Sequence, residues 1–425
     1  MALPSFAPLD ATSYKWHPGS EPGIWQRRAC GIENLDGLEI QNKKGHNDFY
    51  ITVTSHFHDK HLKQDKLIRA IKQVWRRTCF HHPQVACFPV WKGGQLFLTY
   101  RPPAGEDEVA RWVEKTVNLE LSRKGPIEIQ HGLEKRRRAA GGTAESSRPV
   151  SIHIIPSAST TSNSVSHSDV TFLFHLNHIF LDGSGAYSLI GLVLQDLALE
   201  LSAPDEKPEQ FAWENTVQNL PPAFIQIITA DQHLSGPSYD KALQQTLADT
   251  MASQSSWGLK PSGAVSQAAR NEFLVISAIH TDRIRSAARK AGFNITHLAH
   301  AAVFLVGLRA NAPKNPTEAS ERCTIASYFA LDDRQYIDDN LSKHKRLYLP
   351  NCHGHGNIMI DNIQEHVLEP RATPSELRRI LIALAAKIKD CYDTCAQRPS
   401  RVSAGLAFME MLAGMLTAYV TLGLF

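Results

Sequence analysis

The sequence lacks the charge excess and the leader segment that would place it in two large classes of protein. Its formal net charge is only +3 over 425 residues, whereas a general nucleic-acid-binding protein needs a strong basic excess for its phosphate contacts. We therefore expect no nucleic-acid partner. The first residues, Met1–Phe6, have neither the basic flank nor the apolar run of a secretory signal peptide. This predicts a cytoplasmic protein.

Cysteine is also scarce, with seven residues scattered along the chain. A disulfide-rich secreted domain would be short and dense in cysteine, so the pattern favours reduced thiols. A zinc site is the alternative for one group of residues, which comprises Cys352, His353, His355, Cys391 and Cys395. The group has no paired Cys-x-x-Cys, so we expect no metal there and place the two histidines in a loop or cleft.

Several catalytic signatures are missing as well. The chain has no Gly-x-Ser-x-Gly elbow, no His-Glu-x-x-His and no Gly-Lys-Ser/Thr phosphate loop. Serine hydrolases, zinc proteases and P-loop enzymes depend on these residues for a nucleophile, for metal ligands or for phosphate contacts. The sequence therefore argues against a serine hydrolase, a zinc protease and a P-loop enzyme.

The composition is that of an ordinary globular protein, with 43% hydrophobic and 20% charged residues. A chain of 425 residues is too long for one core. Strand-like and helix-like patterns alternate in both halves, which predicts the α/β (α+β) class with two similar layers. We place an N-terminal lobe at 1–204, a weakly patterned connector at 205–270 and a C-terminal lobe at 271–425.

Apolar periodicity predicts the individual elements. Helices are expected over 61–79, 106–121, 186–201, 296–308 and 375–397, the last capped by Ser375. Strands are expected over 48–54, 85–90, 95–100, 151–155, 169–176, 273–277 and 324–331, with a loop and strand over 351–360. The basic run 134–138 is interpreted as a solvated loop, and the Ser/Thr-rich run 157–168 as a loop between strands.

The C-terminal stretch 403–425 carries a single charge, Glu410, and is long enough for a membrane anchor. Its apolar residues recur at helical spacing, however, and it has no basic flank. We therefore favour a buried amphipathic helix over a tail anchor. The inward-facing positions would be Leu406, Phe408, Met409, Leu412, Met415, Leu416 and Tyr419.

The segment from His175 to Gly185 is the most informative in the chain. A strand is followed by His178, and Asp182-Gly183-Ser184-Gly185 then turns into an apolar helix. A neutral imidazole at a strand end can take a proton from a hydroxyl near neutral pH. Asp182 could orient His178, or it could hold the turn by pairing with a distant cation. Glycines here would let the backbone adopt a positive φ and approach a ligand closely.

This segment resembles the His-x-x-x-Asp-Gly motif of the coenzyme A-dependent acyltransferase superfamily, which includes BAHD enzymes, peptide-synthetase condensation domains and fungal trichothecene 15-O-acetyltransferase-type enzymes. Further resemblances follow in order over about 45–400. They are the helix 61–79 with His82-Pro83-Gln-Val85, Asn294-Ile-Thr296 through His300-Ala-Ala302, Leu331-Asp-Asp-Arg334, and Gly356-Asn357. The stretch 16–28 resembles the fungal O-acetyltransferases in particular.

The resemblance implies two chloramphenicol-acetyltransferase-like lobes with a channel between them, and an acyl-CoA-dependent O-acyltransferase of fungal mycotoxin biosynthesis. Acetyl-CoA or another acyl-CoA would be the co-substrate, with no covalently bound cofactor, and the acceptor a small-molecule alcohol. His178 would be the general base. Asp182, Gly183 and Arg334 would support the site, with Asp182 paired to Arg334. Asn177, Ser184 and Asn357 would line the channel of a monomeric enzyme.

The sequence also departs from the family pattern. Asn177 stands where many relatives carry a second histidine, the Asp-Phe-Gly-Trp-Gly motif of BAHD enzymes is absent, and the C-terminal lobe is shorter than usual. An incomplete second lobe is therefore one expectation. The alternative to an active transferase is a degenerate member that binds a ligand without catalysis.

Overall fold

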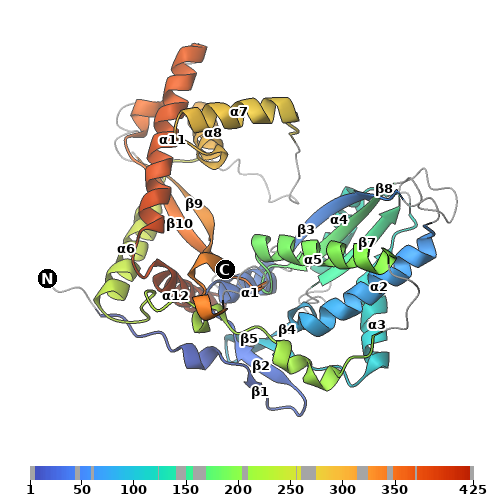
Figure 1. Cartoon of the computed structure of the whole chain (residues 1–425). Helices are drawn as coiled ribbons and strands as arrows, with labels where there is room; N and C mark the ends of the chain where they lie inside the picture. Colours follow the sequence, from blue (N-terminus) through green and yellow to red (C-terminus); the bar gives the residue numbers. More distant parts are fainter. Residues whose placement is uncertain are drawn as a thin grey trace. The chain divides into compact units, whose positions relative to one another are not determined.

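The structure is a computed structural model that describes residues 5–43, 48–58, 62–122, 124–139, 150–156, 169–202, 209–254, 256–259, 274–313, 324–341, 348–368 and 371–421. Two compact units make up the chain (Figure 1). The larger unit comprises Ala7–Ser235, Asp332–His353 and Gly405–Phe425, and the smaller unit comprises Met1–Phe6, Gly236–Leu331 and Gly354–Ala404. This grouping is discontinuous in sequence, unlike the consecutive segments 1–204, 205–270 and 271–425 expected above.

The main sheet of the larger unit has the strand order β3-β8-β7-β6. Its strands are β3 (Asp48–His56), β8 (Asp169–Asn177), β7 (Val150–Pro156) and β6 (Val117–Leu119). The first three strands are antiparallel, and β6 runs parallel to β7. Successive side chains on a strand point to opposite faces. Accordingly, Val170, Phe172, Phe174 and Leu176 form one fully buried face of β8.

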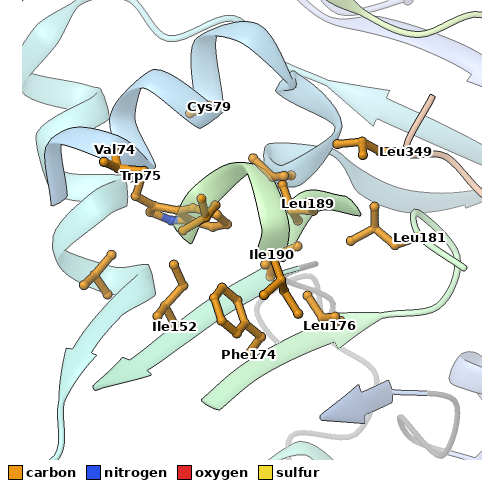
Figure 2. Packing of buried hydrophobic residues seen from close by; sticks show 14 of the residues in the cluster. Val74, Trp75, Cys79, Ile152, Phe174, Leu176, Leu181, Leu189, Ile190 and Leu349 are labelled. Carbon is orange, nitrogen blue, oxygen red and sulfur yellow. The ribbon is translucent and has the colours of Figure 1, made fainter. Parts of the chain in front are cut away.

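Two helices, α2 (Gln64–His81) and α5 (Gly183–Ser202), cover this buried face. Figure 2 shows Trp75 of α2 and Leu189 of α5 packed over Phe174 and Ile152 of the sheet. Full burial of a leucine, isoleucine or phenylalanine side chain stabilises the fold by roughly 1.5–3 kcal/mol. The layer therefore holds the end of β8 and the start of α5 in fixed positions.

A second sheet in the larger unit has the order β1-β2-β5-β4. Its strands are β1 (His17–Pro18), β2 (Trp25–Arg28), β5 (Gln95–Tyr100) and β4 (Phe88–Lys92). Strands β4 and β5 form a hairpin around Gly93 and Gly94, whose φ values are 58° and 77°. Positive φ at both central residues matches a two-residue hairpin turn, which glycine adopts without strain.

Two helices of the larger unit were not predicted. Helix α1 (Ile32–Lys43) has no strong apolar periodicity, and α4 (Pro126–Ala139) carries the basic run 134–138 that was interpreted as a loop. At each N-terminus a glutamate bonds a backbone N–H: Glu33 accepts from Cys30 at 2.9 Å and Glu128 accepts from Gly125 at 2.9 Å. These contacts satisfy donors that the helix itself leaves unpaired.

The predicted helix 106–121 is shorter in the structure. Helix α3 (Glu106–Thr116) ends where Val117 begins β6, because Val117, Asn118 and Leu119 pair with β7. The run 157–168 lies outside the described residues. Seven short 3-10 helices complete the described part of the chain: η1 (Ala11–Tyr14), η2 (Pro83–Ala86), η3 (Trp213–Asn219), η4 (Phe224–Gln226), η5 (Asp333–Tyr336), η6 (Asp339–Leu341) and η7 (Ile363–His366).

The smaller unit is built mainly from helices around a two-stranded sheet. Its elements are α6 (Pro237–Ser253), α7 (Ala278–Lys290), α8 (Ile295–Ala310), α11 (Pro374–Ala396), and the paired strands β9 (Ile325–Asp332) and β10 (His353–Ile360). Helices α8 and α11 pack together through a core that includes Phe304, Leu308 and Leu384. Strands β9 and β10 pack against α8 and α11 in the same core, which includes Phe329 and Ile358 of the strands.

Two predictions in the smaller unit were wrong. Within 273–277 the described residues, 274–277, form no strand; Leu274 is 89% exposed, and Ser277 instead caps α7 by accepting from His280 N. Helix α11 is capped by Thr373 and not by Ser375, because Thr373 and Glu376 form a reciprocal capping box. Part of the expected connector 205–270 is the regular helix α6.

The C-terminal stretch forms helix α12 (Arg401–Thr421). Phe408 and Met409 are buried as predicted, whereas Met415 is 51% exposed. The lone charge, Glu410, accepts hydrogen bonds from Gly31 N and Asn34 Nδ2, both at 2.8 Å. Among the described residues, no single helix has the length and apolar character to cross a membrane; α7 and α8, bent by 97°, meet those criteria only as a pair.

Candidate active site

His178 lies directly after the last residue of β8, on the turn that leads into α5. Its side chain is 28% exposed, but the Nδ1 atom is buried. The ring of Phe49 on β3 meets the imidazole edge to face, with centroids 4.9 Å apart. The strand end and Phe49 therefore bury one side of the imidazole and leave part of the remainder accessible.

The buried nitrogen faces a carboxylate from a distant part of the chain. Asp36 on α1 places Oδ2 3.2 Å from His178 Nδ1, which is an ion-pair distance; the contact does not have hydrogen-bond geometry, and Nδ1 makes no hydrogen bond among the described residues. Asn351 Nδ2 donates to the same Asp36 oxygen at 2.7 Å and to the His178 carbonyl oxygen at 2.9 Å. Asn351 thus bonds both members of the pair.

A second histidine completes this group. The amide oxygen of Asn351 can only accept, so His353 Nδ1 donates to it at 2.7 Å. The rings of His353 and His178 lie 5.3 Å apart between centroids, close to perpendicular. The expectation that His353 lies in a loop or cleft is thereby refined: it stands at the start of β10, beside His178.

The protonation of His178 is set by two opposing effects. Burial alone lowers the pKa of His178, but the close contact with Asp36 and the charge of that carboxylate outweigh burial, and the pKa is raised above its usual value. The pKa of the Asp36 carboxyl is also raised, because burial disfavours its charge more than the contacts with His178 and Asn351 favour it. A close carboxylate therefore stabilises a proton on His178.

Asp182 points to Arg334 and not to His178. Arg334 Nη2 donates to Asp182 Oδ1 at 2.9 Å, and Nη1 donates to Oδ2 at 3.1 Å. Gly185 N donates to Oδ1 at 2.7 Å, and Cys352 N donates to Oδ2 at 3.0 Å. Of the two roles left open by the sequence, the geometry corresponds to holding the turn through a distant cation.

The glycines of the motif differ from each other in their surroundings. Neither Gly183 nor Gly185 has a positive φ, so that expectation was wrong. Gly183 is exposed and has open space around its Cα, whereas a Cβ on Gly185 would collide with the Leu349 carbonyl oxygen and lie 2.9 Å from Arg334 Nη2. Close approach of the backbone is therefore what excludes a side chain at 185.

The other predicted site residues lie in varied places. Asn177 is fully buried, and its Oδ1 accepts from Ile179 N at 3.0 Å, while its Nδ2 has no hydrogen-bond partner among the residues that the structure describes. Ser184 is exposed on the first turn of α5, and Asn357 lies on β10 in the smaller unit. His175, on β8, pairs with Asp48 at 2.8 Å.

Two residues of the site were missed by sequence reasoning, Asp36 and Asn351. Asp36 lies on a helix without a strong apolar stripe, so no periodic signal drew attention to it. Asn351 immediately precedes the Cys352-His353 pair that was considered for zinc. In the described part of the chain, no three His, Cys, Asp or Glu side chains converge in a way that would hold a metal ion.

Comparison with known structures shows the fold of this chain. A trichothecene 15-O-acetyltransferase structure from Fusarium sporotrichioides superposes with a TM-score of 0.84 at 22% identity, covering 97% of this chain and 81% of that one. A condensation domain of a calcium-dependent antibiotic synthetase superposes with a TM-score of 0.56 at 12% identity, covering 88% of this chain and 75% of that one. The predicted two-lobed α/β (α+β) fold of the condensation-domain-like acyltransferases is thus confirmed.

The family described as 15-O-acetyltransferase Tri3 matches residues 6–413, so the chain belongs to this family. A trichothecene O-acetyltransferase from Trichoderma arundinaceum is 22% identical over 98% of this chain and 81% of its own length. A trichothecene 15-O-acetyltransferase from Fusarium sporotrichioides is 23% identical over 98% of this chain and 80% of its own length. The predicted resemblance is confirmed, and the chain is an acyltransferase of the kind that moves groups other than aminoacyl groups.

Proposed function

We propose that this protein transfers an acetyl group from acetyl-CoA to a hydroxyl of a small secondary metabolite, with His178 as the general base. The observation that carries the proposal is the setting of His178, whose Nδ1 is buried against a carboxylate while the side chain stays 28% exposed. Membership of an acetyltransferase family supports the transferred group. The names of the relatives support a trichothecene-type alcohol as acceptor.

The chemistry requires one base and no covalent acyl-enzyme. Neutral His178 accepts the hydroxyl proton at Nε2 while the acceptor oxygen bonds to the thioester carbonyl carbon. The carbon–sulfur bond then breaks, and the same proton passes from Nε2 to the thiolate of coenzyme A. The products are an acetate ester and free coenzyme A. General base catalysis of this kind contributes roughly 10²- to 10⁴-fold in rate.

The experiment measures ester formation and thiol release with acetyl-CoA and a panel of trichothecene alcohols. We expect acetylated product with at least one acceptor and a loss of roughly 10²-fold or more in kcat for His178→Ala. His175→Ala is the matched control, because His175 lies on β8, three residues before His178, and also pairs with an aspartate. It should keep near-normal kcat.

Two results would contradict the proposal. If His178→Ala formed ester as fast as the native chain, His178 would not be the base. If no acceptor were acetylated while acetyl-CoA or an alcohol still bound, the chain would be a binding protein and not a transferase.

A further inference from the structure

We infer that Asp36, and not the aspartate of the His-x-x-x-Asp motif, is the carboxylate that positions His178. Asn351 fixes the position of the Asp36 carboxylate relative to His178. The inference rests on the proposed role of His178 as general base. Both carboxylates are buried, with side-chain exposures of 8% for Asp36 and 3% for Asp182. Only Asp36 reaches the ring, at 3.2 Å from Nδ1.

Asp182 is occupied elsewhere. Each of its oxygens accepts one bond from Arg334 and one from a backbone N–H. Four donors at 2.7–3.1 Å fill the directions in which a carboxylate accepts most strongly. Rotating Asp182 toward His178 would leave the buried Arg334 guanidinium without its main counter-charge, which is costly in a site of low polarity.

Asn351 provides the geometric link between Asp36 and the residue that it serves. One amide nitrogen bonds Asp36 Oδ2 at 2.7 Å and the His178 carbonyl oxygen at 2.9 Å. His353 donates to the amide oxygen, which fixes the amide orientation because that oxygen cannot donate. Helix α1 is thereby tied directly to the end of β8.

Two further contacts set the position of α1 itself. The Arg27 guanidinium forms a buried pair with Glu33 in the first turn, at 2.6 Å and 2.7 Å. At the same helix end, Glu410 of α12 accepts from Gly31 N and Asn34 Nδ2. The N-terminus of α1 is therefore anchored by two carboxylates, and Asp36 projects from a fixed turn.

This arrangement has a direct consequence for the base. Because the Asp36 carboxylate lies 3.2 Å from Nδ1, it favours the proton of the neutral ring on that nitrogen. The lone pair then lies on Nε2, where it can accept a proton. When Nε2 takes the hydroxyl proton, the Asp36 charge stabilises the imidazolium and no proton moves to Asp36. The other titratable groups near the ring are Asp182 before α5 and His353 at the start of β10.

The test is the kinetics of Asp36→Asn with acetyl-CoA and an active acceptor. An amide can present its NH₂ group to Nδ1 and favour the wrong tautomer, so we expect kcat to fall roughly 10²-fold or more with KM values within about 3-fold. The acid limb of the kcat/KM profile should move to lower pH, since burial then acts on His178 without the opposing charge. A residue that only supported the fold would not move this limb.

Asp48→Asn is the matched control, because Asp48 makes the corresponding pair with His175 and is fully buried. It should leave kcat and the pH profile near normal. If Asp36→Asn fails to fold, Asn351→Ser tests the same link and should lower kcat roughly 10-fold with the same direction of pH shift. Unchanged kcat and pH profile in the folded variant would overturn the inference.

The two variants distinguish failure of the role of Asp36 from failure of the proposed general base. Activity that survives Asp36→Asn but is lost in His178→Ala refutes the role of Asp36 and leaves the general base in place. Activity that survives His178→Ala refutes the general base itself.

Discussion

Breaking the pair between Asp182 and Arg334 should destabilise the larger unit, and breaking both halves at once should cost less than the sum. The pair is bidentate, and its side chains are only 3% and 10% exposed. Arg334 also donates to the carbonyl oxygens of Tyr348 at 2.8 Å and Pro350 at 3.1 Å. We choose Arg334→Met and Asp182→Asn because each keeps most of the side-chain volume.

The magnitude follows from what each change leaves behind. Removing one partner of a buried ion pair costs roughly 3–5 kcal/mol, mainly because the other charge stays buried. Asp182 retains two backbone donors after Arg334→Met, so we expect the lower end, about 3 kcal/mol. Asp182→Asn should cost a similar amount, since Arg334 keeps Asp332 and its carbonyl partners. Contacting residues typically couple by about 0.5–3 kcal/mol, so the double variant should lose less than the sum by that amount.

The assay is urea unfolding of all four proteins, followed by tryptophan fluorescence and by circular dichroism. At about 2 °C per kcal/mol, thermal melting should fall by roughly 6 °C in each single variant. Strict additivity in the double variant would refute the direct coupling of Asp182 to Arg334. If either single variant melted at the same temperature as the native chain, the claim that a buried unpaired charge destabilises the protein would be refuted as well.

Four shorter predictions follow from other contacts. Gly185→Ala should lower the free energy of unfolding by about 2–4 kcal/mol in a urea titration, because the new methyl group meets the Leu349 carbonyl. The kcat/KM of the native enzyme should rise with pH through an apparent pKa above 6.5, because the raised pKa keeps His178 protonated and inactive below it. Burial lowers the pKa of His82 from 6.5 to about 4, so stability to urea should be lost as pH falls between these values, and His82→Gln should lose less. Glu410→Ala should cost about 2–3 kcal/mol in the same titration, because Arg28 on β2 and Gly31 and Asn34 at the start of α1 lose their acceptor.

The parts of the fold that could be predicted are those with a strong local pattern. The alternation along β8 and the apolar run of α5 both reflect burial against neighbours in the same layer. Helix α1 could not be predicted in this way, because its start is stabilised by Glu410, 376 residues from Asn34 in sequence. The run 274–277 is apolar but exposed, so its pattern suggested a strand where no strand forms.

In the site, too, residues in a local motif could be predicted, and residues that depend on long-range contacts could not. His178 and Asp182 belong to one short motif. The resemblance of 331–334 to the family's strand-end arginine indicated Arg334 as the distant partner of Asp182. Asp36 and Asn351 could not be inferred, because they meet only through a contact spanning 315 residues. Neither lies in a motif whose spacing carries chemistry, and only the three-dimensional arrangement brings them to His178.

The hydrogen bonds of Asn351 also determine when the site can exist during synthesis. Asn351 bonds His178 across 173 residues and Asp36 across 315 residues, and Arg334 reaches Asp182 across 152 residues. A ribosome that has completed β8 and α5 has therefore made Asp36 and His178 but neither Asn351 nor Arg334. Such long sequence separations slow the final step of folding. A nascent or truncated chain ending near residue 235 would carry the motif without an assembled site.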